Sequence, residues 1–350
     1  MRYCSMIVFS WFALTYAGAQ QPPPKGPIFP PINPVTAKLD ITVTGLDGPG
    51  FALAVGGDGD LIVTACEKGT LLAYKKDAIA AFKSEVGKPD VWKGHDGPVR
   101  HIAWHGGPTL VSVGTDKKVN FWKVPDGKVT SSAAADFRVL AVALTSDGKT
   151  LATAGESDTI QLWDVASGKP TAKLTDKMDW TLSVAFSADG KQLLSGDWIG
   201  NVRIWDVAGA KKTSQFMPTP NPAPKVLPDP VPVTNIAYAP DGKSVLLGTA
   251  EGPIHVITIP DGKIVRTHVG HAGPITGMLF HPSGTLIATA SKDRTVKLWN
   301  PAAPAPLKSL DGHGAWIEGI RFLEQGTKLA TVSADQTVRI WDLAEAAKKK

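Results

Sequence analysis

The sequence predicts an all-β fold, a seven-bladed propeller of four-stranded antiparallel blades. Three observations carry this prediction: a repeat of about 42 residues, short β-type runs in every repeat, and no helical periodicity. A unit of this length cannot bury its own apolar face, so we expect the units to stack on one another around a ring. The third run of each unit ends in an apolar, usually aromatic residue: Tyr74, Trp122, Trp163, Trp205, Ile257, Trp299 and Trp341.

Strand and turn signals alternate within the units. Val296 and Leu298 flank Lys297, an alternation typical of a half-buried strand. Four units have a turn dipeptide between their first two runs: Asp147-Gly148, Asp189-Gly190, Asp241-Gly242 and Ser283-Gly284.

The two chain ends predict how the ring closes. The last unit stops after its third strand, at residues 340–342, whereas Leu39 to Val43 forms a strand ahead of the first complete unit. We therefore expect this N-terminal strand to pair with the last blade, which leaves few exposed strand edges.

A second pattern consists of Gly-His openings followed by an Asp, as in Gly270-His271 with Asp293, and of Trp-Asp endings such as Trp341-Asp342. With these motifs, residues 37–343 resemble the WD-repeat β-propeller family. The resemblance implies that each His bonds the Asp and connects through a Ser or Thr to the Trp indole. Blades one, three, four and five lack the His, and we expect them to depend more on packing. The implied structural networks are His95/Asp116/Trp122, His271/Asp293/Trp299 and His313/Asp335/Trp341.

The repeated His and Asp residues have an alternative interpretation as a metal site or an acid–base dyad. Each His occupies the same position in a different blade, so these side chains are spread around the ring and do not converge as ligands must. The sequence also has no Gly-rich phosphate loop, no pair of Cys ligands and no nucleophile elbow. It therefore predicts no metal, no cofactor and no enzymatic activity.

Residues 1–19 have the pattern of a secretory signal. Arg2 precedes an apolar stretch from Met6 to Leu14, and Ala17-Gly18-Ala19 supplies small residues for cleavage. The alternative is an uncleaved anchor, although the stretch is short against the roughly 20 residues that span a bilayer. We expect a protein exported from a bacterial-type cell, periplasmic or extracellular.

The segments that flank the propeller are a proline-rich spacer, residues 20–36, and a basic tail, residues 344–350. The formal net charge is +5, but Arg2 and the three terminal lysines supply four of these charges, so the body is nearly neutral. This balance predicts no nucleic-acid partner. Cys66 is the one cysteine beyond the signal, and its apolar surroundings favour a packed role.

Strand order predicts which loops share a face. In an up-and-down blade, the turn between strands two and three lies at the same end as the segment that enters strand one, so residues from both form one face around the mouth of the central channel. Six residues before the end of strand one, most units have proline, but two have Trp180 and Trp316 and one has Arg138. Trp198 lies in the turn between strands two and three of the blade that contains Trp180. We predict Trp180, Trp198, Trp316 and Arg138 as the binding cluster. Alternatively, Trp180 and Trp198 only stack on each other and cover blade four.

An insertion, Met217 to Pro232, contains seven prolines and should emerge on the same face. It is either an extended ligand for an aromatic groove or a tolerated surface insertion. Blade five follows it and has Ile257 and Glu251 at the Trp and Asp positions, so we expect this blade to be the least rigid.

These features favour a non-catalytic, monomeric scaffold that presents its rim to a protein or peptide. A lectin-like or small-molecule binding propeller, with rim tryptophans stacked on sugar rings, is the alternative. An enzyme is the third class. It would need convergent acidic or metal-binding residues at the channel mouth, and the sequence pattern places none there.

Overall fold

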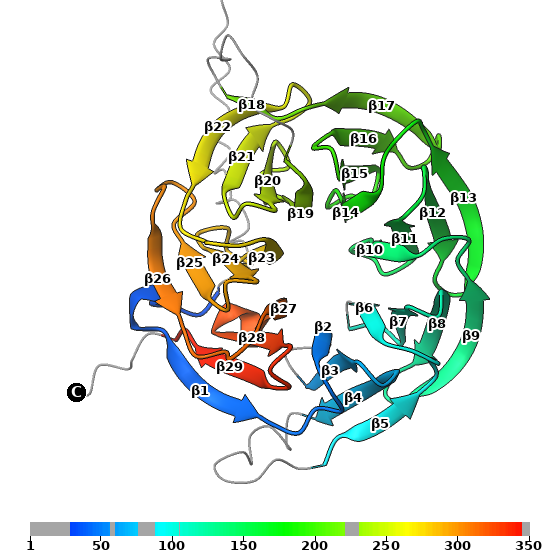
Figure 1. Ribbon diagram of the computed structural model, residues 1–350, viewed down its shortest axis with the longest axis horizontal. Helices are drawn as coiled ribbons and strands as arrows, with labels where there is room; N and C mark the ends of the chain where they lie inside the picture. Colours follow the sequence, from blue (N-terminus) through cyan, green and yellow to red (C-terminus); the bar gives the residue numbers. More distant parts are fainter. Residues whose placement is uncertain (1–28, 57–59, 76–87, 105, 221–230, 345–350) are drawn as a thin grey trace, which may run out of the picture.

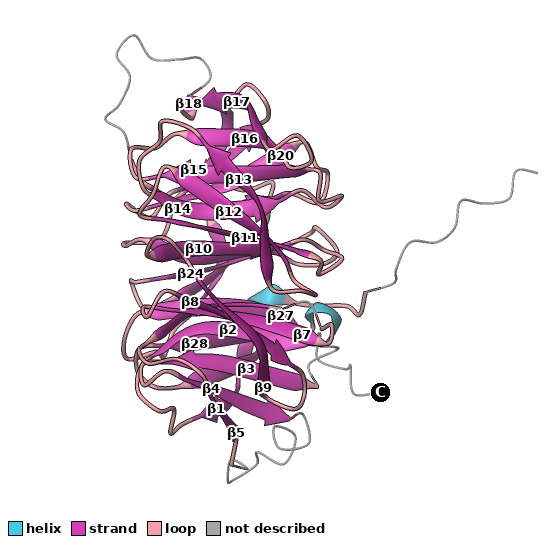
Figure 2. Ribbon diagram, turned by 90° about the vertical axis from the view of Figure 1, so that its right-hand side faces the viewer, coloured by secondary structure: helices cyan, strands magenta, loops and turns pink. Residues whose placement is uncertain are grey.

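The computed structural model describes residues 29–56, 60–75, 88–104, 106–220 and 231–344. Within these ranges, seven sheets surround a central channel (Figure 1) and form a flattened disc when seen edge-on (Figure 2). Every blade contains four antiparallel strands in sequence order from the channel outwards, apart from the last. The predicted seven-bladed propeller is confirmed.

The first four blades are continuous in sequence. Blade one contains β2 (Gly50–Gly56), β3 (Leu61–Cys66), β4 (Thr70–Lys75) and β5 (Asp90–Lys93). Blade two contains β6 (Val99–Ala103), β7 (Thr109–Gly114), β8 (Lys118–Lys123) and β9 (Lys128–Ala134). Blade three contains β10 (Val139–Leu144), β11 (Thr150–Gly155), β12 (Thr159–Asp164) and β13 (Lys169–Thr175). Blade four contains β14 (Thr181–Phe186), β15 (Gln192–Asp197), β16 (Val202–Asp206) and β17 (Lys211–Phe216).

The last three blades include one added strand and one strand from the N-terminus. Blade five contains β19 (Val233–Tyr238), β20 (Ser244–Thr249), β21 (Ile254–Thr258) and β22 (Lys263–His268), with the short β18 (Thr219–Pro220) at its outer edge. Blade six contains β23 (Ile275–Phe280), β24 (Ile287–Ser291), β25 (Val296–Trp299) and β26 (Pro306–Leu310). Blade seven contains β27 (Ile317–Leu323), β28 (Lys328–Ser333), β29 (Val338–Asp342) and β1 (Lys38–Val43).

Strand β1 closes the ring, as predicted. It pairs antiparallel with β29, with Leu39 opposite Trp341 and Val43 opposite Val338. Figure 1 shows this join as the blue strand beside the red C-terminal blade. The pairing covers the outer edge of β29, which would otherwise expose a row of unpaired backbone groups.

The packed structure begins upstream of the predicted boundary at Ala37. The Asn33 backbone N–H donates to the Leu343 carbonyl oxygen at 2.8 Å, Ile32 forms a bridge with Ala344, and the Phe29 ring lies 6.0 Å from the ring of His281. The spacer prediction for residues 20–36 is therefore wrong for residues 29–36, because apolar side chains among the prolines dock on the propeller. The predicted signal, residues 1–19, lies outside the described residues.

Helical structure in the described part of the chain is confined to two short 3-10 turns, η1 (Pro34–Thr36) and η2 (Glu324–Gly326). Neither is long and apolar enough to cross a membrane. The predicted Asp-Gly turns are present, and Gly148 and Gly190 have φ values of +71° and +69°, a conformation that favours glycine.

The core of the described residues is divided among the junctions between blades. Leu53 and Ile62 of blade one share an apolar cluster with Val332 and Ile340 of blade seven, and six further clusters join the other neighbouring pairs. No cluster is confined to a single blade. Stacking therefore supplies the burial that one unit could not provide.

Candidate functional site: the rim and mouth of the central channel

One face of the ring is built from seven equivalent backbone contacts. In every blade, the residue before strand one accepts a hydrogen bond, through its carbonyl oxygen, from an N–H in the turn between strands two and three, at 2.9 to 3.2 Å. These bonds join the segment that enters strand one to the turn between strands two and three of the same blade. The side chains of both segments therefore lie on the same face of the ring, which we call the rim. The pairs are Pro49–Glu67, Pro98–Thr115, Arg138–Glu156, Trp180–Trp198, Pro232–Ala250, Pro274–Lys292 and Trp316–Ala334.

A second sevenfold feature lies just inside the rim. The register of strands one and two shifts after the first residue of strand one in every blade, which is a β-bulge. A bulge leaves one residue outside the ladder and re-aims its side chain. All seven residues line the channel: Phe51, Arg100, Leu140, Leu182, Thr234, Thr276 and Glu318.

Trp180 and Trp198 form an exposed aromatic pair on blade four. Their ring centroids lie 6.3 Å apart at an interplanar angle of 64°, an edge-to-face contact. Their exposed fractions are nevertheless 48% and 53%. The two indoles therefore contact each other, as one interpretation of the sequence predicts, and still offer apolar surface to a partner.

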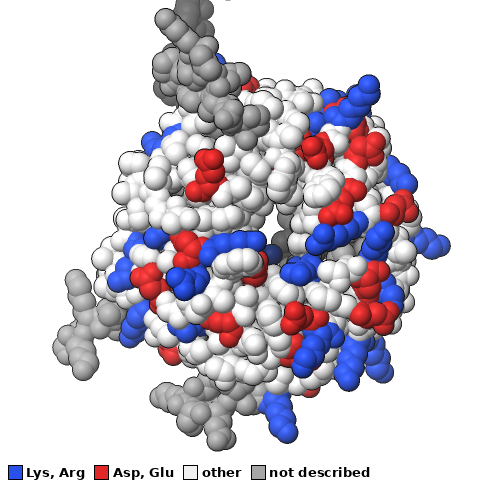
Figure 3. Space-filling view, in the orientation of Figure 1, with Lys and Arg blue, Asp and Glu red and all other residues white. Residues whose placement is uncertain are grey.

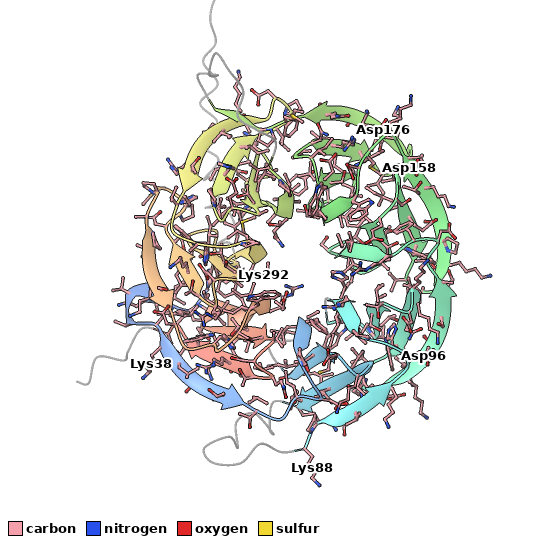
Figure 4. The ribbon with its side chains drawn as sticks, in the orientation of Figure 1. Lys38, Lys88, Asp96, Asp158, Asp176 and Lys292 are labelled. Carbon is pink, nitrogen blue, oxygen red and sulfur yellow. The ribbon has the colours of Figure 1, made fainter. Side chains whose placement is uncertain are left out.

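The other two residues of the predicted cluster have separate surroundings. Arg138 on blade three pairs with Glu156 at 3.0 Å and lines the channel together with Trp198. Trp316 lies on blade seven, where the Lys292 ammonium group sits 4.5 Å from its ring centroid in a cation–π contact. Figure 4 labels Lys292 beside the central opening. The structure thus places all four residues on one rim, with Trp316 separated by the intervening blades from Trp180 and Trp198.

Sequence reasoning missed several charged residues of the channel. Arg100 and Glu318 occupy bulge positions, and Arg321 lies three residues further along β27. The Arg100 guanidinium stacks 3.8 Å above the Phe51 ring. A sequence signal for these residues was present two positions after the residue that precedes strand one. At this position Arg100 and Glu318 interrupt a series of uncharged residues. Only the repeated bulge, however, shows that this position faces the channel.

The channel environment shifts the pKa values of these groups. Burial raises the pKa of the Glu318 carboxyl, although Lys292 and Arg100 act against this shift. Burial lowers the pKa of the Arg100 guanidinium and, together with the Arg100 charge, lowers the pKa of His101 to about 4. His101 is therefore neutral at pH 7, and it adds no charge to the channel.

A buried ion-pair network supports the Trp198 turn in blade four. Arg203 is 2% exposed, and it donates to Asp197 Oδ2 at 2.6 Å, to Asp176 Oδ2 at 3.1 Å and to the Lys177 carbonyl oxygen at 3.2 Å. Asp197 Oδ1 also accepts from the backbone N–H groups of Ile199 and Asn201. The expectation that blade four relies on packing is therefore wrong, because Arg203 and two carboxylates take the place of the His network.

Three blades contain the hydrogen-bond chains that the family resemblance implies. In blade two, the Trp122 indole donates to Ser112 Oγ at 2.7 Å, Ser112 bonds His95 Nε2 at 2.7 Å, and His95 Nδ1 donates to Asp116 at 2.9 Å. The same chain joins Trp299, Thr289, His271 and Asp293 in blade six. It joins Trp341, Thr331, His313 and Asp335 in blade seven.

These chains occupy both ring nitrogens of each His, so neither nitrogen is free to bind a metal. The described residues also contain no group of three or more His, Cys, Asp or Glu side chains placed to hold a metal ion. Burial raises the pKa of Cys66 to about 11, which keeps this thiol protonated and unreactive at neutral pH.

The start of the proline-rich insertion differs from the prediction that it emerges on the rim. Thr219 and Pro220 pair in parallel with Lys263 and Ile264, so this part of the insertion runs along the outer edge of blade five. An unpaired edge strand accepts such an addition readily. Pro232, at the other end, returns to the rim, and residues 221–230 lie outside the described residues.

The fold and the rim together define a class of protein, a propeller whose loop-built face is the candidate contact surface. Comparison with protein families then identifies the family. The model described as WD domain, G-beta repeat matches residues 88–123, 127–164, 168–206, 262–300 and 304–342. These segments make up more than half of the chain, and the chain belongs to this family. They leave out most of blades one and five, whose third strands have Tyr74 and Ile257 at the Trp position.

Among curated proteins, the chain is similar to several eukaryotic ones over a short region. It is 34% identical over 74 residues to the periodic tryptophan protein 2 homolog of Schizosaccharomyces pombe, which is 21% of this chain and 9% of that protein. It is 26% identical over 69 residues to the COMPASS component SWD3 of Saccharomyces cerevisiae, 20% of this chain and 22% of that protein. It is 31% identical over 67 residues to WD repeat-containing protein 74 of Bos taurus, 19% of this chain and 17% of that protein. The similarity spans less than a quarter of each relative.

Proposed function

We propose that this protein is a non-catalytic scaffold whose rim binds a protein or peptide partner. The observation that carries the proposal is the half-exposed pair of Trp180 and Trp198, held on a rigid turn. Amphipathic aromatics of this kind are frequent energetic anchors of interfaces, with losses of about 2 kcal/mol or more on truncation. The buried Arg203–Asp197 pair beneath the turn keeps the indoles in place before a partner arrives, which lowers the entropic cost of binding.

The experiment is affinity capture with the tagged protein as bait, with bound proteins identified by mass spectrometry. The Trp180→Ala/Trp198→Ala variant should lose the partner that the unchanged protein captures. Its melting temperature should change little, because about half of each side chain is already exposed. Val265→Ala is the matched control, since Val265 is 53% exposed on the outer strand β22, away from the rim. Equal capture by all three proteins would refute the proposal.

A sugar-binding function would use the face of the Trp316 ring. The Lys292 ammonium group already occupies one face of that ring, although Trp316 is still 52% exposed, and this contact favours a peptide or protein partner over a stacked sugar. A glycan array with signals that disappear in Trp316→Ala would reverse the preference.

We further propose that the protein is exported. The apolar stretch from Met6 to Leu14 and the small residues Ala17-Gly18-Ala19 support this proposal. N-terminal sequencing of protein purified from its natural host should give Gln20 as the first residue. A chain that still begins at Met1 and stays with the membrane fraction would favour the uncleaved anchor.

A further inference from the structure

The lining of the central channel is mainly cationic. The volume of the channel is about 780 Å³, and its charged lining residues are four cations, Arg100, Arg138, Lys292 and Arg321, and one carboxylate, Glu318. Lys and Arg side chains lie on both sides of the opening in the space-filling view (Figure 3). A cavity of this size is comparable to ligand sites in other proteins, which measure roughly 300 to 1,000 Å³.

Three of these four cations form no ion pair with a carboxylate among the described residues, although the Glu318 charge acts on Arg100 and is acted on by Lys292. Arg138 pairs with Glu156. Lys292 instead sits on the Trp316 ring, and Arg321 donates to the Ile320 carbonyl oxygen at 2.7 Å. Arg100 stacks on Phe51, and its buried Nε has no hydrogen-bond partner in the described part of the chain.

Arg100 is partly removed from water without a carboxylate at ion-pair distance, which costs free energy that a bound anion would recover. Arg321 is exposed and lines the channel, so its guanidinium is accessible to the same anion. Arginine suits a carboxylate in particular, because its planar fork donates two parallel hydrogen bonds. Small residues interrupt the larger side chains of the wall and leave room for an extended chain, among them Ala52, Ala141, Gly277 and Gly319.

We infer that the central channel binds the carboxylates of an acidic, extended peptide segment of a protein partner, with Arg100 near the rim and Arg321 deeper in the channel as its principal ligands. This inference rests on the proposed function and adds the chemistry of the partner. A peptide fits better than a nucleic acid, because phosphate backbones need a continuous basic track. Figure 3 shows Lys and Arg side chains intermixed with Asp and Glu on the lower and right parts of this face, so no continuous basic track is visible.

The test uses the full chain and fluorescence anisotropy with a fluorescein-labelled hexaglutamate peptide. Hexaglutamate should bind, hexaglutamine should not, and added salt should weaken the binding. Arg100→Gln/Arg321→Gln should weaken the affinity at least tenfold. Lys149→Gln/Lys243→Gln removes the same charge from two exposed turns on the opposite face and should leave the affinity unchanged. Thermal melts of both variants verify that they fold.

The inference would be overturned if hexaglutamate did not bind, or if both double variants lost the same affinity for it. Tighter binding of labelled oligothymidylate than of hexaglutamate would also overturn it, in favour of a nucleic acid. The proposed function is tested separately, because peptide binding needs no natural partner. Capture that depends on Trp180 and Trp198 without hexaglutamate binding would refute the acidic segment alone.

Discussion

The backbone N–H of Trp198 donates to the carbonyl oxygen of Trp180 at 3.0 Å, and the two indoles meet edge to face. The hydrogen bond is the blade-four copy of a contact that recurs in all seven blades, so the backbone of the pair is fixed by the propeller. The side chains, in contrast, are particular to this blade. A general scaffold thus orients a specific contact surface.

The two indoles should act as one unit in partner binding. Each ring limits the motion of the other, so removing one also releases its neighbour. We expect a double-mutant cycle with Trp180→Ala and Trp198→Ala, measured by calorimetry with the captured partner, to give a coupling energy of about 0.5 to 1.5 kcal/mol. Additive losses would mean that the edge-to-face contact has no role in binding.

Arg203 should be important for the stability of blade four. Arg203→Met leaves the buried Asp197 carboxylate without its cation, and we expect a loss of about 3 kcal/mol in the free energy of unfolding. The matched control is Lys212→Met, because Lys212 also pairs with Asp176 but is one-third exposed, and it should cost less than about 1 kcal/mol. Denaturant titration measures both losses, and similar values would contradict this assignment.

The hydroxyl group at the centre of a His network should matter more than the same group in a blade without the His. Thr331→Val leaves both His313 Nε2 and the Trp341 indole without a partner, and we expect a loss of about 2 to 3 kcal/mol. Thr153→Val in blade three orphans the Trp163 indole alone and should cost about 1 kcal/mol. The same denaturant titration compares these two shape-matched changes. Equal costs would show that the His adds nothing to the network.

Stability should fall as the pH drops from 7.5 to 5.5. Burial lowers the pKa of both His268 and His313, although a hydrogen bond with Asp335 opposes the shift for His313. Each His therefore takes up a proton in the unfolded chain near pH 6.5, before the folded protein does, so its stabilising contribution is complete above that pH and is lost below it. The slope is at most about 1.4 kcal/mol per pH unit for each group.

His268→Leu should make this pH dependence shallower, because it removes a fully buried His that packs on Trp299. Unfolding free energies at several pH values give the two slopes, and identical slopes would rule out His268 as a contributor. Asp335 acts in a different range. Burial alone would raise its pKa, but hydrogen bonds from Thr337, His313 and the Gly314 backbone outweigh burial and lower the pKa to about 2, so this contribution is lost only below pH 4.

Ring closure should depend on Val43, the buried residue of β1. Val43→Asp places a charge in the cluster shared by blades one and seven, where Val43 is 2% exposed, and we expect a loss of about 3 kcal/mol or more. Leu39→Asp, at an exposed position of the same strand, should cost less than about 1 kcal/mol. Thermal unfolding of both variants checks the difference, and equal melting temperatures would mean that β1 is dispensable for closure.

The sequence by itself determined the fold, down to the pairing of Leu39–Val43 with the last blade. It could do so because a repeat that cannot bury its own face must stack on its neighbours, and because strands, turns and Trp positions recur in phase. The N-terminal strand supplies the strand that the last unit lacks, which predicts a closed ring. The location of the rim residues could also be predicted from the sequence, since strand order alone decides which loops share a face.

Only the tertiary structure decided what the rim residues contact. The bulge that turns Arg100 and Glu318 into the channel depends on how strands one and two pair, and this pairing is seen only in the folded blade. The Arg203 network joins residues from three separate segments, Asp176, Asp197 and Arg203, which the blade brings together only when it folds. Periodicity describes what the units have in common, whereas recognition depends on side chains in which they differ, and the surroundings of those side chains are set by packing between distant segments.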